Sequence, residues 1–109
     1  MHELALTESV VDAVCERIPD GQVIRVCLEV GRLTAVVPDA MRFCFEACTQ
    51  GTRLEGAALD IVEVPAQVRC RSCGRISELD SPIPLCACGS ADLDIRSGHE
   101  LRIREVEVS

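Results

Sequence analysis

Lysine, tryptophan and tyrosine are missing from this sequence of 109 residues, and its only aromatic side chains are Phe43 and Phe45. The 11 basic residues are all arginines and face 18 acidic residues, so the formal net charge is −7. Nucleic-acid binders usually carry a basic surface, and proteins that hold single strands stack bases on aromatic side chains. The composition therefore argues against binding to nucleic acid.

Long apolar runs are also missing. No stretch is long enough to cross a bilayer, and the first residues do not follow the pattern of a signal peptide. We therefore expect no membrane association and a cytoplasmic location. The length suits one compact domain with a small metal-binding module attached.

Cysteine, in contrast, is abundant, and four of the eight cysteines form two close pairs, Cys70 with Cys73 and Cys86 with Cys88. A glycine follows each pair, which allows two tight turns to direct four sulfurs to one point. Four thiolates in a tetrahedron suit Zn²⁺, and such spacings are its usual sequence form. The sequence predicts a closed, structural zinc site. Iron in the same site and a disulfide framework are the alternatives, the second disfavoured without a secretory signal.

The second cysteine pair is unusually short, because only Ala87 separates Cys86 from Cys88. If one of these two sulfurs does not reach the metal, water, His99 or a more distant cysteine would complete the shell. We expect His99 to be an exposed side chain at the end of a strand rather than a ligand.

Hydrophobic periodicity predicts an α+β fold in which two helices pack on a three-stranded sheet. We expect helices over residues 4–18 and from Pro38 to near Gly51, and strands over residues 22–33, 59–64 and 101–108. The last two strands slip in phase, which either a bulge or burial on both faces would explain. The cysteine segment forms a zinc-ribbon-like module inserted before the last strand, and it has too few large apolar residues to build a core without a metal.

The chain starts with Met1-His2-Glu3, which brings an amine, an imidazole and backbone amides together. Nitrogen donors arranged in a plane suit Ni²⁺ and Cu²⁺. A histidine near a chain end is weak evidence by itself, since most chain termini are frayed and solvated.

With this start, the sequence resembles the HypA/HybF family of hydrogenase-maturation nickel metallochaperones. The resemblance covers essentially the whole chain. It rests on Met1-His2-Glu3, Val30-Gly31-Arg32-Leu33, Phe43-Cys44-Phe45, Gly51, residues 61–66 leading into Cys70, and Glu100-Leu101.

The resemblance implies a metallochaperone, not an enzyme, that binds Ni(II) at its N-terminus and delivers it for maturation of [NiFe]-hydrogenase. His2 would be the essential nickel ligand, completed by the N-terminal amine of Met1 and nearby backbone nitrogens, with Glu3 ligating through its backbone or supporting the site. Structural Zn(II) would be held by Cys70, Cys73, Cys86 and Cys88. Residues 1–64 with 94–109 would form the nickel-binding domain, and residues 65–93 the zinc-binding domain.

The implied partners are a HypB-type GTPase, the precursor of the [NiFe]-hydrogenase large subunit and, in some organisms, urease maturation proteins, with no nucleic acid and no membrane. The family's second cysteine pair usually has two intervening residues, so closure of the site by Cys86 and Cys88 is the point at which this chain departs from the pattern.

Two other functions compete with this interpretation. A zinc-ribbon module for protein interaction or nucleic-acid binding would use the cysteine turns as its contact surface. A thiol oxidoreductase would use Cys70 and Cys73, but such a pair normally opens a helix. The remaining cysteines are Cys15, Cys27, Cys44 and Cys48; we expect the last two to pack in the core beside Met41 and Phe45.

Overall fold

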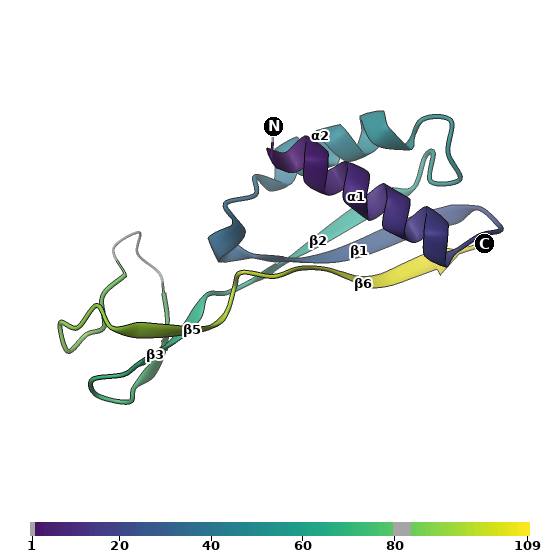
Figure 1. Cartoon of the computed structure of the whole chain (residues 1–109). Coiled ribbons are helices and arrows are strands. Elements are labelled where there is room, and N and C mark those ends of the chain that lie inside the picture. Colours follow the sequence, from purple (N-terminus) through teal and green to yellow (C-terminus); the bar gives the residue numbers. More distant parts are fainter. Residues whose placement is uncertain (1, 80–83) are drawn as a thin grey trace. The chain divides into compact units, whose positions relative to one another are not determined.

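The computed structural model describes residues 2–79 and 84–109 (Figure 1). This part of the chain contains α1 (His2–Arg17), β1 (Val23–Gly31), a short 3₁₀ helix η1 (Arg32–Thr34), α2 (Pro38–Thr49), β2 (Ala58–Val64), β3 (Gln67–Cys70), β4 (Ile76–Glu78), β5 (Leu93–Ser97) and β6 (Leu101–Val108). The strands form two sheets, in the orders β2-β1-β6 and β4-β3-β5. The predicted α+β fold is confirmed, and the second sheet adds three short strands that the sequence pattern did not predict.

The chain divides into two compact units. The first comprises Met1–Glu29, Val36–Val62 and Arg102–Ser109, and the second comprises Val30–Ala35 and Glu63–Leu101. No helix in the described part of the chain is long and apolar enough to cross a membrane.

In the first unit, α1 and α2 cover one face of the β2-β1-β6 sheet (Figure 1). The apolar stripe of α1 packs inward through Val10, Val11 and Val14, because residues three and four apart share one face of a helix. Pro38 occupies the first turn of α2, where its missing N–H is not needed. The most deeply buried apolar side chains of this core are Val14, Val23, Val26, Leu28, Met41 and Leu54.

Charged side chains line the opposite face of this sheet. Arg25 of β1 is ion-paired with Asp60 of β2 and with two carboxylates of β6, and Glu29 of β1 is paired with two arginines of β6. The β6 partners are Arg102, Arg104, Glu105 and Glu107. These four reach one face although the alternation breaks between positions 104 and 105, and no β6 residue is fully buried. Burial on both faces therefore does not account for the phase slip of β6.

In the second unit, β3 pairs antiparallel with β4 and with β5. Val68 and Cys70 point to the buried face of β3, whereas Gln67 and Arg69 are exposed. Its buried apolar side chains, among the described residues, are Val30, Ala66, Val68, Cys70 and Cys86. This small set confirms the expectation that the segment has little apolar core.

Two glycines of the second unit allow a close approach of three backbone segments. A Cβ atom at Gly31 would collide with the carbonyl oxygen of Gly98, and one at Gly98 would lie 2.5 Å from the Cα atom of Ala66. Gly98 also has a φ of +103°, which side chains strongly disfavour. Only glycine fits both positions without moving the backbone.

Candidate metal centre

The four paired cysteines come from the end of β3, the turn to β4 and the loop before β5. In the first turn, the N–H of Gly74 donates to the carbonyl of Cys70 at 2.8 Å, and the φ of Gly74 is +79°. In the second, the N–H of Gly89 donates to the carbonyl of Cys86 at 2.9 Å, and the φ of Gly89 is +93°. Each glycine thus adopts the left-handed conformation that closes a tight turn.

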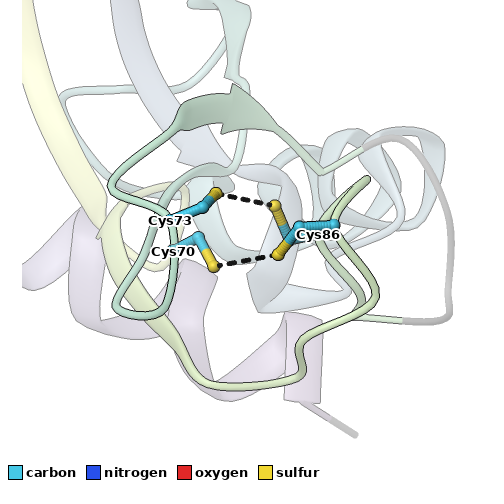
Figure 2. Close-up of side chains that lie close together, drawn as sticks. Cys70, Cys73 and Cys86 are labelled. Atoms are coloured by element: carbon cyan, nitrogen blue, oxygen red, sulfur yellow. Dashed lines mark hydrogen bonds between the residues drawn. The ribbon is translucent and has the colours of Figure 1, made fainter.

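The turns bring the four sulfurs together, and Figure 2 shows thiols of the two pairs facing one another. The sulfurs of Cys70 and Cys88 are 3.6 Å apart, as are those of Cys73 and Cys86, and all four lie within 4.8 Å of one another. A tetrahedral metal with bonds of about 2.3 Å requires sulfurs separated by about 3.8 Å. A disulfide would need about 2.05 Å. The geometry fits a four-thiolate metal centre.

The short second pair does not prevent this arrangement. Cys86 and Cys88 both direct their sulfurs to the centre with only Ala87 between them. The N–H of Cys86 donates to the carbonyl of Ser90 at 2.9 Å, which holds the turn closed. Four thiols are already assembled, so the geometry does not require His99, an exposed residue just before β6.

The thiols of Cys70 and Cys88 differ in proton affinity. The backbone N–H of Cys73, supported by that of Ser72, lowers the pKa of Cys70 to about 6. The amide of Ser90 also lowers the pKa of Cys88, but the adjacent thiols of Cys86 and Cys70 outweigh it and raise that pKa to about 11. Crowded thiolates repel one another, and a divalent cation removes this repulsion by binding them all while the protons leave.

The residues around the centre are polar, and ion pairs and a hydrogen bond connect them. Cys70 and Cys86 are buried, whereas Cys73 and Cys88 are exposed. Arg71 pairs with Asp92 and with Asp94, so its charge is balanced by carboxylates. The hydroxyls of Ser72 and Ser90 lie 2.9 Å apart and connect the two turns.

The N-terminal residues form the second candidate site. His2 is exposed and begins α1, and Met1 lies outside the described residues. A carboxylate oxygen of Glu3 accepts a hydrogen bond of 3.0 Å from the N–H of Val37, the residue that precedes α2. This bond is the main reason why the pKa of Glu3 is lowered, and the charge of His2 contributes in the same direction. Glu3 therefore holds the first turn of α1 beside the start of α2.

The other cysteines differ from our expectation. Cys44 and Cys48 were predicted to pack in the core, but both are only half-buried, because the inward face of α2 carries Met41, Phe45 and Thr49. Burial raises the pKa of Cys48. Cys27, in contrast, is buried on β1.

The oxidoreductase alternative loses its structural basis. Cys70 ends β3, and the segment from Cys73 to β4 is a turn rather than the start of a helix. A reactive cysteine pair of that class draws on the dipole at a helix N-terminus.

The fold and the centre define a small α+β metal-binding protein with a zinc-ribbon-like four-cysteine cluster. A family model described as "Hydrogenase/urease nickel incorporation, metallochaperone, hypA" matches residues 1–108, and the chain therefore belongs to the HypA family.

Similar proteins agree with this assignment. The chain is 51% identical over 108 residues to "Hydrogenase maturation factor HypA" of Nostoc punctiforme, covering 99% of this chain and 96% of that protein. It is 48% identical over 110 residues to the factor of the same name from Geobacter metallireducens, covering 99% of each. The solution structure of the Ni metallochaperone HypA from Helicobacter pylori has the same fold, with a TM-score of 0.68, 22% identity, and coverage of 99% of this chain and 97% of that one.

Proposed function

We propose that this chain is a nickel metallochaperone that binds Ni(II) at its N-terminus and delivers it for maturation of [NiFe]-hydrogenase, with Zn(II) held by Cys70, Cys73, Cys86 and Cys88. The main support is that the four thiols form a complete shell of their own. A closed four-ligand shell has no open position. A cargo metal therefore needs other donors, and His2 at an exposed helix start offers them.

The nickel site of this proposal uses the imidazole of His2, the amine of Met1 and nearby backbone nitrogens. Nitrogen sets of this kind suit Ni²⁺ in a square plane. Glu3 supports the site, because its carboxylate fixes the first turn of α1 against Val37. A site at an exposed chain end also permits transfer, since a second protein can approach and replace its ligands one at a time.

Zn(II) is the metal that we assign to the four cysteines. Sulfur separations of 3.6 Å match a tetrahedron of the size that zinc requires. Its role is structural: bound zinc fixes the two turns that β3 and β5 flank. The nickel-binding domain corresponds to residues 1–64 with 94–109, and the zinc-binding domain to residues 65–93.

The proposal includes a cytoplasmic, non-enzymatic role. Its expected partners are a HypB-type GTPase, the precursor of the hydrogenase large subunit and, in some organisms, urease maturation proteins. The net charge of −7 and the scarcity of aromatic residues favour this role over the competing zinc-ribbon module for nucleic acid.

Native mass spectrometry of untagged protein tests the two metal sites together. We expect one zinc per chain in the parent and in a His2→Ala variant. Added Ni²⁺ should bind the parent in a one-to-one ratio and should not bind His2→Ala. A His99→Ala variant is the matched control, since it removes the chain's other imidazole, and it should bind nickel like the parent.

A peptide tag placed before Met1 provides a second test, because it removes the free amine next to His2 while leaving the imidazole in place. The tagged protein should lose nickel and keep zinc. Nickel binding that survives both the tag and His2→Ala would exclude a terminal site.

A further inference from the structure

The chain's two aromatic side chains lie on α2 in opposite environments. Phe45 is 3% exposed and belongs to the core, whereas Phe43 is 74% exposed. Burying a phenylalanine is worth about 1.5–3 kcal/mol. The exposed side chain of Phe43 does not contribute this stabilisation. Phe43 is nevertheless one of only two phenylalanines in a sequence without tryptophan or tyrosine.

Phe43 does not stand alone on the helix surface. Ala47 is exposed one turn further along α2, Ala40 is half-buried one turn before, and Val37 precedes the helix with 55% of its surface exposed. Positions 40, 43 and 47 share one face, because helical residues three and four apart are neighbours. We call Val37, Ala40, Phe43 and Ala47 the α2 strip.

The α2 strip starts beside the proposed nickel site. The N–H of Val37 donates to the Glu3 carboxylate, and Glu3 is adjacent in sequence to His2. A protein bound along the strip would consequently be held next to the first turn of α1, where nickel is expected to leave.

The charges around the strip indicate what such a protein should present. Asp39 and Glu46 of α2 lie next to it. The Asp39 side chain is 95% exposed and forms an ion pair with Arg42. Acidic residues outnumber arginines two to one in the first unit. An apolar segment bordered by lysine or arginine is complementary to this surface, and an amphipathic helix presents such a pattern.

We propose that the α2 strip is the docking surface for a partner protein in nickel transfer, and that this partner contributes an apolar helical segment bordered by basic side chains. The inference rests on the proposed function, since it places the partner where the terminal nickel site can be reached. Phe43 is its central contact, as exposed aromatic residues dominate the affinity of many interfaces.

Binding of a purified HypB-type GTPase to the parent and to two single variants, measured by isothermal titration calorimetry, tests the proposal. Phe43→Ala should weaken binding by at least about 30-fold, the usual loss for a central aromatic contact. Ile76→Ala is the matched control, because Ile76 is 53% exposed in the second unit, and it should change affinity less than about twofold. Asp39→Asn combined with Glu46→Gln should weaken binding and reduce its dependence on salt.

Nickel binding of each isolated variant, measured in parallel, separates this proposal from the terminal site. Phe43→Ala should bind nickel like the parent. Equal GTPase affinity of the parent and Phe43→Ala overturns the docking proposal, as does a GTPase that does not bind the parent while nickel still binds at His2. Self-association of the parent that disappears in Phe43→Ala also overturns it, because the strip would then bind a second copy of the chain.

Discussion

The two units of this chain reach a defined structure by different means. The first buries valine, leucine, methionine and phenylalanine side chains between two helices and a sheet. The second buries Val30, Ala66, Val68 and two cysteines, and its sheet is made of strands three to five residues long. Apolar burial therefore accounts for the first unit, whereas the second depends on a centre of four thiols.

This difference bears on the two metal roles that we propose. A metal held by the four thiols of the second unit would add folding free energy that apolar burial does not supply, and we therefore expect it to stay bound. The first unit has an apolar core of its own, so in our proposal it can present the exposed His2 to a nickel ion that is passed on. The cysteine-rich unit is thus the part least suited to release its metal.

Metal removal should have the largest effect on this comparison. A strong chelator, or Cys86→Ser, should unfold the second unit while the first keeps its structure, because zinc binding supplies about 10–16 kcal/mol in small zinc-dependent folds. Amide hydrogen exchange measures both units at once: protection should disappear in β3 and β5 and persist in α1 and β1. Equal loss in both units would contradict separate stabilisation.

A core substitution should produce the reverse effect. Leu28 is fully buried on β1, and Leu28→Ala should lower the free energy of unfolding of the first unit by about 2–5 kcal/mol while the chain still binds one zinc. Chemical denaturation followed by helical circular dichroism measures this change. Phe43→Ala removes an exposed side chain from the same unit and should change the stability by less than about 0.5 kcal/mol.

Backbone packing in the second unit should have a smaller but specific effect. Gly98→Ala forces a side chain into a φ of +103° and against the backbone of Ala66, and strain of this kind costs about 1–3 kcal/mol. Gly56→Ala is the control, because Gly56 has a φ of +79° but nothing near its Cβ position. If both variants lower the thermal midpoint equally, the close packing of Gly98 against Ala66 adds nothing to the cost of placing a side chain at a positive φ.

Substitutions at Glu3 should give the smallest effect and should be confined to nickel. Glu3→Gln keeps an oxygen that accepts from the N–H of Val37 and should change nickel affinity less than about threefold. Glu3→Ala removes this acceptor and should weaken nickel binding by about 5–10-fold, because the first turn of α1 loses its hydrogen bond to the segment that precedes α2. Competition with a colorimetric chelator measures both values, and zinc content should not change in either variant.

Much of the fold could be predicted from side-chain periodicity. The helix predicted from Pro38 to near Gly51 runs from Pro38 to Thr49, and the strand predicted over residues 101–108 is β6. The strands of the second unit could not be predicted, because β4 has only three residues and its neighbours bury few apolar side chains. A sheet held mainly by a metal centre leaves almost no hydrophobic pattern in the sequence.

Each cysteine of the candidate metal centre could be predicted from the sequence, but whether all four sulfurs reach one point could not. Spacing identified four cysteines, but whether one residue between Cys86 and Cys88 suffices depends on backbone dihedral angles, such as the φ of Gly89, that composition does not reveal. The partial exposure of Cys44 and Cys48 was not predicted, because both lie less than one helical turn away from the buried residues of α2. The link from Glu3 to Val37 is a tertiary contact between distant positions, which a single sequence does not indicate.

X-ray absorption at the nickel and zinc edges of one sample loaded with both metals tests the separation of the two sites most directly. We predict four sulfur neighbours at about 2.3 Å around zinc. Around nickel we predict nitrogen and oxygen neighbours without sulfur. Sulfur in the nickel shell, or fewer than four sulfurs around zinc, would contradict the assignment of one metal to each unit.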